Sequence, residues 1–312
     1  MSDAAGDASG PADGACVAIT AADGVRIALR RIGTATGTPA VLVPGTFSNH
    51  TFWLGTRGTG FARELAQSGY DTWVLDPRGH GLSARPRPHD HWRFDDWARR
   101  DVPAALETAF AQRSGFVIGH SAGGAAALVA VATNPALRER VRGMVIIGTP
   151  FPWLQPFSRL GAITLRSLSR VLGRFPARAL RLGPEDELAG VMIQWMDWNL
   201  AGHWRGDDGT DYGQAIAALD LPLLVIAAAA DRWAPPPSCR ALLDSVSSPD
   251  RTWLLLGTET GFSHDFGHVD MLVGRTARAE VWPLIRQWID RRNVTSDRGG
   301  LSDPASSPKF RG

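Results

Sequence analysis

Ser121 stands in a sequence context that can turn its hydroxyl into a nucleophile. It lies within Gly-His-Ser-Ala-Gly at positions 119–123, between the apolar, β-favouring run 116–118 and the small-residue, helix-favouring run 125–132. A strand that turns sharply through G-x-S-x-G into a helix holds the serine exposed and strained, as a nucleophile elbow. The two glycines fit this turn, because a Cβ at either position would collide with the neighbouring strand or helix. The alternative is a chance match of a short pattern in an Ala- and Gly-rich chain.

A serine hydroxyl is a weak nucleophile near neutral pH, so it needs a base within reach and an acid that orients this base. Asp231 directly follows an apolar run that ends in four alanines, which predicts its carboxylate at the same sheet edge as Ser121. His268 comes after a later predicted strand and before the last predicted helix. The chain order Ser, Asp, His accompanies a G-x-S-x-G elbow on a parallel sheet. We therefore expect Ser121, Asp231 and His268 to be catalytic.

Both partners of the serine have competitors. Asp231 could instead cap the helix expected beyond residues 235–237, and Asp76, which also follows a strand, is a minor candidate for the acid. His264 competes with His268 for the base. We favour His268, because Gly267 flanks it and the final amphipathic segment begins soon after it.

Acyl transfer also needs donors for a negative oxygen, and backbone N–H groups are suited to this task. The expected oxyanion hole consists of the N–H groups of Ala122 and Thr46, the latter in the loop Pro-Gly-Thr-Phe-Ser-Asn at 44–49. Gly45 would let this loop approach closely. Phe47 remains an alternative second donor, and an ordinary strand-ending turn is the simpler interpretation of the loop.

Strand and helix patterns alternate from residue 40 onward. Runs 16–20 and 25–32 predict a leading antiparallel hairpin; further strands are expected at 40–43, 70–75, 141–148, 221–230 and 252–256, and helices at 61–68, 94–110, 238–245 and 277–290. This order predicts an α/β fold, a mostly parallel sheet with helices on both faces. Active sites of such sheets lie at the carboxyl ends of the strands, where every segment singled out above is placed.

The alternation stops between residues 150 and 219, which we interpret as an inserted helical cap with helix-compatible stretches at 160–172 and 185–200. The core is expected to comprise 15–149 and 220–292, and the polar ends 1–14 and 293–312 are expected to be disordered. The cap is rich in tryptophan, whose indole supplies large apolar area, although core packing is the commoner role of any one Trp. The residues expected to bind substrate are Phe47, His120, Trp153, Trp195 and Trp198.

Composition excludes several classes of protein. A net charge of +2 over 312 residues gives no nucleic-acid footprint, and two distant cysteines, Cys16 and Cys239, imply neither a disulfide framework nor a metal cluster. The N-terminal residues lack the features of a secretory signal, and no apolar run reaches the roughly 18 residues of a membrane span. We expect a cytoplasmic protein that binds a small molecule and no metal.

Taken together, these residues resemble the α/β-hydrolase superfamily. Asp-Pro-Arg-Gly-His-Gly at 76–81, His-Trp-Arg-Phe-Asp-Asp at 91–96, Asp-Val-Pro-Ala at 101–104 and His-Val-Asp at 268–270 look like the acid lipase branch, the lysosomal and gastric lipases, with some similarity to polyhydroxyalkanoate synthases. The resemblance covers roughly residues 25–150 and 220–290. A serine nucleophile argues against the synthases, which use cysteine, and against dehalogenases and epoxide hydrolases, which use aspartate. The short cap departs from the lipase pattern.

The resemblance implies hydrolysis of a carboxylic ester through an acyl-enzyme, without a metal or organic cofactor. The Trp-bearing cap suggests an apolar acyl or alcohol group. A lactonase or carbon–carbon bond hydrolase could use the same triad. A small-molecule receptor could retain the triad with almost no turnover. A non-catalytic scaffold could preserve only the shape of the elbow.

Overall fold

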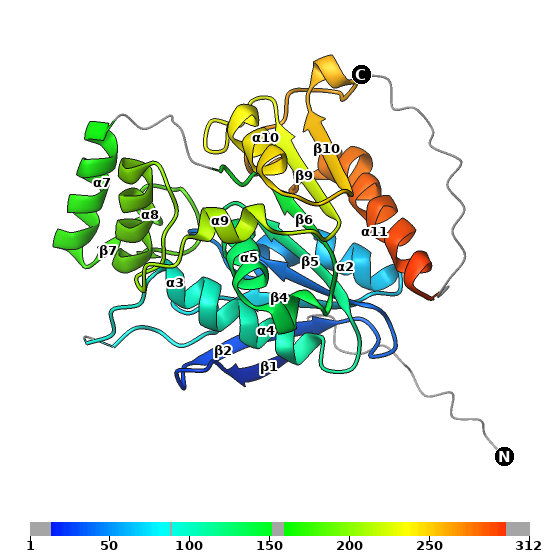
Figure 1. The fold of residues 1–312 in the computed structure, drawn as a ribbon, viewed down its shortest axis with the longest axis horizontal. Helices are drawn as coiled ribbons and strands as arrows, with labels where there is room; N and C mark the ends of the chain where they lie inside the picture. Colours follow the sequence, from blue (N-terminus) through cyan, green and yellow to red (C-terminus); the bar gives the residue numbers. More distant parts are fainter. Residues whose placement is uncertain (1–13, 88, 152–158, 298–312) are drawn as a thin grey trace.

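An eight-stranded sheet forms the centre of the computed structural model, which describes residues 14–87, 89–151 and 159–297 (Figure 1). The strand order is β1-β2-β4-β3-β5-β6-β9-β10. The strands are β1 (Ala15–Thr20), β2 (Arg26–Ile32), β3 (Pro39–Val43), β4 (Asp71–Asp76), β5 (Gly115–His120), β6 (Val141–Ile147), β9 (Leu223–Ala228) and β10 (Arg251–Leu256). The hairpin β1–β2 and the pair β2–β4 are antiparallel, and the other pairs of this eight-stranded sheet are parallel. The expected mostly parallel sheet is confirmed.

Helices cover both faces of the sheet, as the alternating pattern predicts. One face carries η1 (Trp97–Asp101), α4 (Val102–Ala109), α5 (Ala122–Thr133), α6 (Pro135–Arg138), α9 (Tyr212–Ala217) and α10 (Pro236–Ser245). The other carries α1 (Thr51–Leu54), α2 (Phe61–Gln67), η3 (Ala277–Val281) and α11 (Trp282–Asp297). Strands β3, β4, β5 and β9 are buried along their whole length, which explains the continuous apolar runs of β3 and β9.

The helix expected over 94–110 is divided into three parts. It begins as α3 (Phe94–Asp96), widens into the π-helical turn η1 and continues as α4. Pro103 stands in the first turn of α4 and has no N–H to donate to the turn before it, which is the π-helical turn η1. The helical run therefore continues through the proline, with an irregular turn directly before it.

The segment between β6 and β9 contains α7 (Arg159–Leu172), β7 (Arg174–Phe175), β8 (Glu187–Leu188), α8 (Ala189–Ala201) and α9. Helices α7 and α8 pack on each other beside the sheet, at the left of Figure 1. Helix α9, which the sequence pattern did not reveal, packs instead on α5 of the main core through Tyr212 and Ile216. None of the described helices is long and apolar enough to span a membrane. The ends 1–14 and 293–312 were expected to be disordered, and this expectation is wrong for residues 293–297, over which α11 continues. The parts 1–13 and 298–312 lie outside the described ranges.

Candidate active site

Ser121 forms the turn between β5 and α5, at the carboxyl edge of the sheet. Its backbone has φ 54° and ψ −128°, a strained conformation for a residue with a side chain. The close packing expected around the turn is present: a Cβ on Gly119 would lie 2.5 Å from Gly124 Cα, and one on Gly123 would lie 2.3 Å from Pro44 O. The sequence therefore folds locally into the strand, sharp turn and helix that G-x-S-x-G requires.

Asp231 and His268 are joined by a hydrogen bond, with His268 Nδ1 2.7 Å from Asp231 Oδ2. Because a carboxylate only accepts, this contact leaves Nε2 of the neutral ring as an acceptor. The other carboxylate oxygen, Oδ1, accepts from the N–H groups of Trp233 and Ala234, at 2.8 and 2.9 Å. Asp231 is 4% exposed, so these bonds fix it at the end of β9. Its carboxylate thus orders the loop before α10 and also orients an imidazole.

Ser121 and His268 line one cavity, but no hydrogen bond joins their side chains in the part of the chain that the structure describes. Contacts between a nucleophile and its base commonly shorten when substrate binds. His264, the competing base, has a side chain 42% exposed and lies 3.5 Å from Asp270, away from Asp231. The structure brings His268, and not His264, to the buried acid.

Asp76, the competing acid, is engaged elsewhere. Its Oδ2 lies 2.8 Å from His50 Nδ1 and accepts from the N–H of Leu82 at 3.0 Å. Burial raises the pKa of Asp76, but the hydrogen bonds from His50 and the backbone outweigh it, so this pKa lies below its usual range. The carboxylate therefore stabilises the loop after β4.

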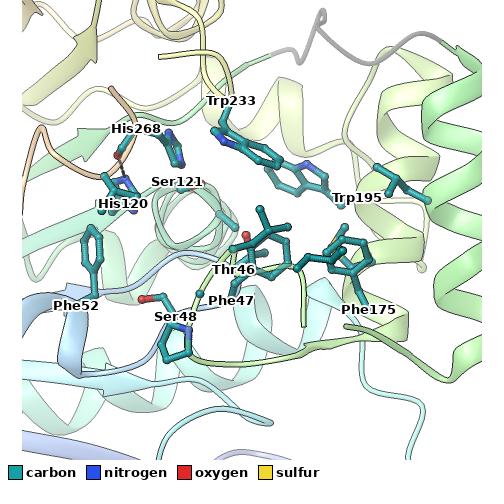
Figure 2. Close-up of a pocket in the computed structure, with 18 of the residues that line it drawn as sticks. Thr46, Phe47, Ser48, Phe52, His120, Ser121, Phe175, Trp195, Trp233 and His268 are labelled. Carbon is teal, nitrogen blue, oxygen red and sulfur yellow. Dashed lines mark hydrogen bonds between the residues drawn. The ribbon is translucent and has the colours of Figure 1, made fainter. Parts of the chain in front are cut away.

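His120, the variable residue of the elbow, contacts the backbone of the candidate base. Its Nε2 lies 2.8 Å from His268 O, and its ring stacks on Phe52 at 4.6 Å between centroids. Burial lowers the pKa of His120 well below its usual range, and the neighbouring His268 lowers it further. His120 is therefore neutral, and because a carbonyl only accepts, its proton is on Nε2. The bond holds the His268 backbone beside the elbow (Figure 2).

The backbone around Thr46 comes close to the serine. A Cβ on Gly45 would lie 2.9 Å from Ser121 Cβ, so only glycine permits this approach. Phe47 has a positive φ of 62°, and its N–H donates to Glu187 Oε2 at 3.2 Å. Phe47 is thus engaged with a carboxylate, which favours Thr46 over Phe47 as a donor. Ala122 is the first residue of α5, a position whose N–H has no partner within its own helix.

Two carboxylates after α7, which the sequence analysis did not single out, hold this loop. Glu185 accepts from Asn49 Nδ2 at 2.7 Å and from the Gly81 N–H at 2.9 Å. Glu187 accepts from Phe47 and lies 3.2 Å from Nε2 of His80, as an ion pair and not as an aligned hydrogen bond. Both stand in a segment of helical sequence pattern, which gave no signal that they would be buried.

His80 is fully buried beside Glu187, with Trp97 edge-on to its ring. Burial lowers the pKa of His80, but the carboxylates of Glu187 and Glu185 outweigh both burial and the repulsion from Arg85, so this pKa lies above its usual value. When protonated, the ring therefore stabilises the contact between the loop at 46–48 and the segment that carries Glu187.

We expect the free energy of unfolding to depend on pH through His80. Because its pKa is higher in the folded than in the unfolded state, its stabilisation is complete below about pH 6.5 and is lost as the pH rises through the raised pKa. In denaturant titrations between pH 6 and 9, the free energy of unfolding should decline less steeply with pH for His80→Gln than for the wild type. The two slopes should differ by at most about 1.4 kcal/mol per pH unit. The exposed His203→Gln serves as control and should keep the wild-type slope. Equal slopes for wild type and His80→Gln would contradict this assignment.

The cavity around Ser121 has a volume of about 420 Å³. Five of the residues proposed from the sequence line it, namely Thr46, Phe47, Ala122, His120 and Trp195. Within the described ranges, no Asp, Glu, Lys or Arg side chain lines it. Figure 2 shows His268, His120 and Phe52 on one side of the cavity and Trp195 and Phe175 on the other.

Trp198 was expected to bind substrate, and this expectation is wrong. Its side chain is 5% exposed and packs against Phe94, Trp204 and Tyr212, while its Nε1 donates to Arg205 O at 2.8 Å. Trp195 and Trp198 are three positions apart along α8, and only Trp195 contributes to the cavity wall. Trp153, the remaining candidate, lies outside the described residues.

Several cavity residues were not foreseen. They are Phe52 of α1, Leu165, Phe175, Met192 and Met196 from the segment between β6 and β9, and Trp233 and Val269. Trp233 follows Asp231 by two positions and Val269 directly follows His268, so adjacency to the candidate triad was an available signal. The others had none, because an apolar residue in a helix or a short strand looks the same in sequence whether it lines a cavity or packs in a core.

Sequence comparison agrees with this geometry. The model of the α/β hydrolase fold family matches residues 38–194, and the chain belongs to this family. Among curated proteins, the chain is 28% identical over 143 residues to human lipase member K, covering 40% of this chain and 36% of that protein. It is 28% identical over 149 residues to mouse gastric triacylglycerol lipase, covering 43% of this chain and 38% of that one. The chain thus matches little more than a third of the length of these relatives.

A solved structure shows the same fold over nearly the whole chain. The thermophilic esterase from Thermogutta terrifontis superposes with a TM-score of 0.63 at 19% identity, covering 89% of this chain and 99% of the esterase. The predicted α/β-hydrolase fold and the similarity to gastric lipases are both confirmed.

Proposed function

We propose that this protein hydrolyses carboxylic esters through an acyl-enzyme on Ser121. The observation that carries the proposal is the buried Asp231–His268 pair, which opens into the same cavity as a serine held at φ 54°. The lipase names among its relatives favour ester hydrolysis over the other reactions available to such a triad.

In the proposed first step, His268 Nε2 takes the proton of Ser121 as Oγ attacks the ester carbonyl. Asp231 holds the ring in the tautomer with the proton on Nδ1 and stabilises the imidazolium that forms. His268 then gives the proton to the departing alcohol oxygen. In the second step, water attacks the acyl-enzyme with His268 again as base, and Ser121 regains its proton as the acid leaves.

The proposed oxyanion hole is formed by the N–H groups of Ala122 and Thr46. The bond from Phe47 N–H to Glu187 and the close packing at Gly45 fix the second donor in advance. Such preorganised donors are worth about 2.7–4 kcal/mol of transition-state stabilisation each. Glu187 is thereby proposed as a positioning residue for the loop.

Residues 150–219 are proposed to act as a cap that supplies the acyl-binding wall. Their contribution to the cavity is apolar, from Leu165, Phe175, Met192 and Trp195, and uncharged walls favour an apolar acyl chain. The core residues 15–149 and 220–292 supply the candidate triad.

The purified protein tests the proposal directly. It should release p-nitrophenol from p-nitrophenyl butyrate and decanoate, and a fluorophosphonate should label Ser121, as read by mass spectrometry of the digested protein. Absence of both turnover and labelling would refute the proposal, and labelling at a different serine would refute the assignment of Ser121.

Trp195 and Trp198 form a matched pair for testing the cap. Trp195→Ala removes part of the cavity wall, so kcat/KM for the decanoyl ester should fall about tenfold relative to the acetyl ester. Trp198→Ala creates a void in the core and should instead lower the free energy of unfolding by about 3–5 kcal/mol. Equal effects of Trp195→Ala on the two esters would contradict the proposed acyl wall.

A further inference from the structure

A second cavity, of about 440 Å³, adjoins the one around Ser121. The two share four lining residues, Ser48, Phe52, Pro184 and Val269. The rest of the second wall comes from Thr51, from residues 55–57 and 59–60, and from residues within the segment 272–282 that follows the candidate base. The two cavities therefore adjoin at the side of the site where His268 and Phe52 lie (Figure 2).

The second cavity has a positive rim. Arg57, Arg275 and Arg278 line it, and no Asp or Glu does within the described residues. Arg278 lies 3.5 Å from Glu64, whereas the described part of the chain provides no ion-pair partner for Arg57 or Arg275. Both of these arginines are exposed, so their guanidinium groups can meet a ligand.

Arg57 also lines a third cavity, of about 370 Å³, together with Arg30 and Arg63. The positive groups thus extend beyond the second cavity rather than ending at it. By contrast, no Asp, Glu, Lys or Arg of the described ranges lines the first cavity. One part of the ligand should be apolar and another negatively charged.

The chemistry of ester hydrolysis indicates whether the acyl part or the alcohol part of the ester carries the negative charge. The base that takes the serine proton must give it to the leaving alcohol, so the alcohol oxygen lies on the His268 side. The segment after His268, including Arg275, forms the second cavity, and the apolar wall with Trp195 and Phe175 lies on the opposite side. The alcohol part therefore extends toward the arginines and the acyl part toward α8.

We infer that the substrate is an ester of an apolar acid with an alcohol that carries an anionic group, a carboxylate or a phosphate, bound by Arg57 and Arg275. The inference rests on the proposed ester hydrolysis. The acyl–oxygen bond breaks, the alcohol leaves with the proton from His268 and keeps its anionic group, and water releases the fatty acid from Ser121. A guanidinium binds either anion through paired N–H donors.

Three decanoyl esters that differ only in the alcohol test this inference: those of 1-butanol, 4-hydroxybutanoate and 3-hydroxypropyl phosphate. For the wild type, kcat/KM from decanoate release should be at least about tenfold higher for one of the anionic esters than for the butyl ester. The better of the two identifies the anion. Arg57→Gln combined with Arg275→Gln should bring the ratio of anionic to butyl ester close to one, and 0.5 M salt should reduce it. Arg291→Gln, an exposed arginine on α11 outside these cavities, should keep the wild-type ratio.

Failure of the inference and failure of the proposed function give different results. If the wild type cleaves p-nitrophenyl decanoate but prefers neither anionic ester, or if the double variant keeps the preference, the arginine site is wrong and the hydrolase remains. If no ester is cleaved, calorimetric titration of Ser121→Ala with the intact anionic and butyl esters tests binding at the arginine site independently of hydrolysis. Equal affinities would overturn it, and at least tenfold tighter binding of an anionic ester that is lost in the arginine variant would support it.

Discussion

Ser121→Ala is expected to reduce kcat for p-nitrophenyl esters by about 10⁴- to 10⁶-fold, the scale on which serine enzymes lose turnover without the nucleophile. The change removes one oxygen from an elbow whose shape is set by the packing of Gly119 and Gly123 and by the bond from Ser121 N to Ile147 O at 2.9 Å. None of these contacts needs the hydroxyl. The fold should therefore persist while the chemistry is lost, as measured by steady-state kinetics and thermal unfolding of the same preparations.

Ser247→Ala provides the control for a serine-to-alanine change away from the site. Ser247 is exposed, and its Oγ donates to Ala217 O. This variant should keep wild-type turnover and fluorophosphonate labelling. If Ser121→Ala retained turnover within tenfold of the wild type, the nucleophile would have to be a different group. Unfolding of Ser121→Ala at a much lower temperature would instead show that the hydroxyl supports the fold.

The sequence predicts the sheet and its coverage because the local signals agree with the long-range ones. Apolar runs such as 40–43 and 141–148 become strands buried on both faces, and the Asp-Gly turn at 23–24 joins β1 to β2. The strand order could not be obtained in this way, because pairing depends on contacts far apart in the chain. Helix α9 was missed because six residues are too few to show a helical period.

The candidate triad was predictable because its residues follow strands in a fixed order, and a carboxyl edge collects such positions. The choice of His268 over His264 rested on flanking residues alone, and the short contact with Asp231 is information that only the folded chain contains. The cavity wall was the least predictable part. Trp195 and Trp198 look alike in sequence, and the packing of α8 alone determines which of them is exposed to the cavity.

Motifs that carry the resemblance to acid lipases are largely structural in this chain. Arg78 is fully buried and bonds through Nε to Asp101 at 2.9 Å and through Nη1 to Asp23 at 2.6 Å. Burial raises the pKa of Asp101 to about 6, against the opposing effect of Arg78. Arg78 and Asp101 do not line the cavity around Ser121, so they identify the fold without identifying the substrate.

His268→Ala is expected to reduce kcat for esters by several orders of magnitude, whereas His264→Ala should alter it less than about threefold. Only His268 touches Asp231, at 2.7 Å, and lines the cavity with Ser121. His264 contacts Asp270 at 3.5 Å with 42% of its side chain exposed, which makes it a matched control from the same loop. Asp231→Asn should also be severely impaired, because an amide cannot hold the imidazole in the required tautomer.

A pH profile distinguishes a base from a residue that merely supports the loop. In the wild type, kcat/KM should fall on acidification, because a protonated imidazole cannot accept the serine proton. The residual activity of His268→Ala should lose this acid limb, and the profile of His264→Ala should match the wild type. If His264→Ala were the inactive variant, the assignment of His268 as the base would be wrong, but the proposal of ester hydrolysis would still hold. If both variants kept full activity, neither histidine would be the base, and the proposed acyl-enzyme mechanism would need a different proton acceptor for Ser121. His120, whose Nε2 donates to His268 O, would have only Nδ1 to offer, and burial makes this ring a weak base because it lowers the pKa of His120 well below its usual range.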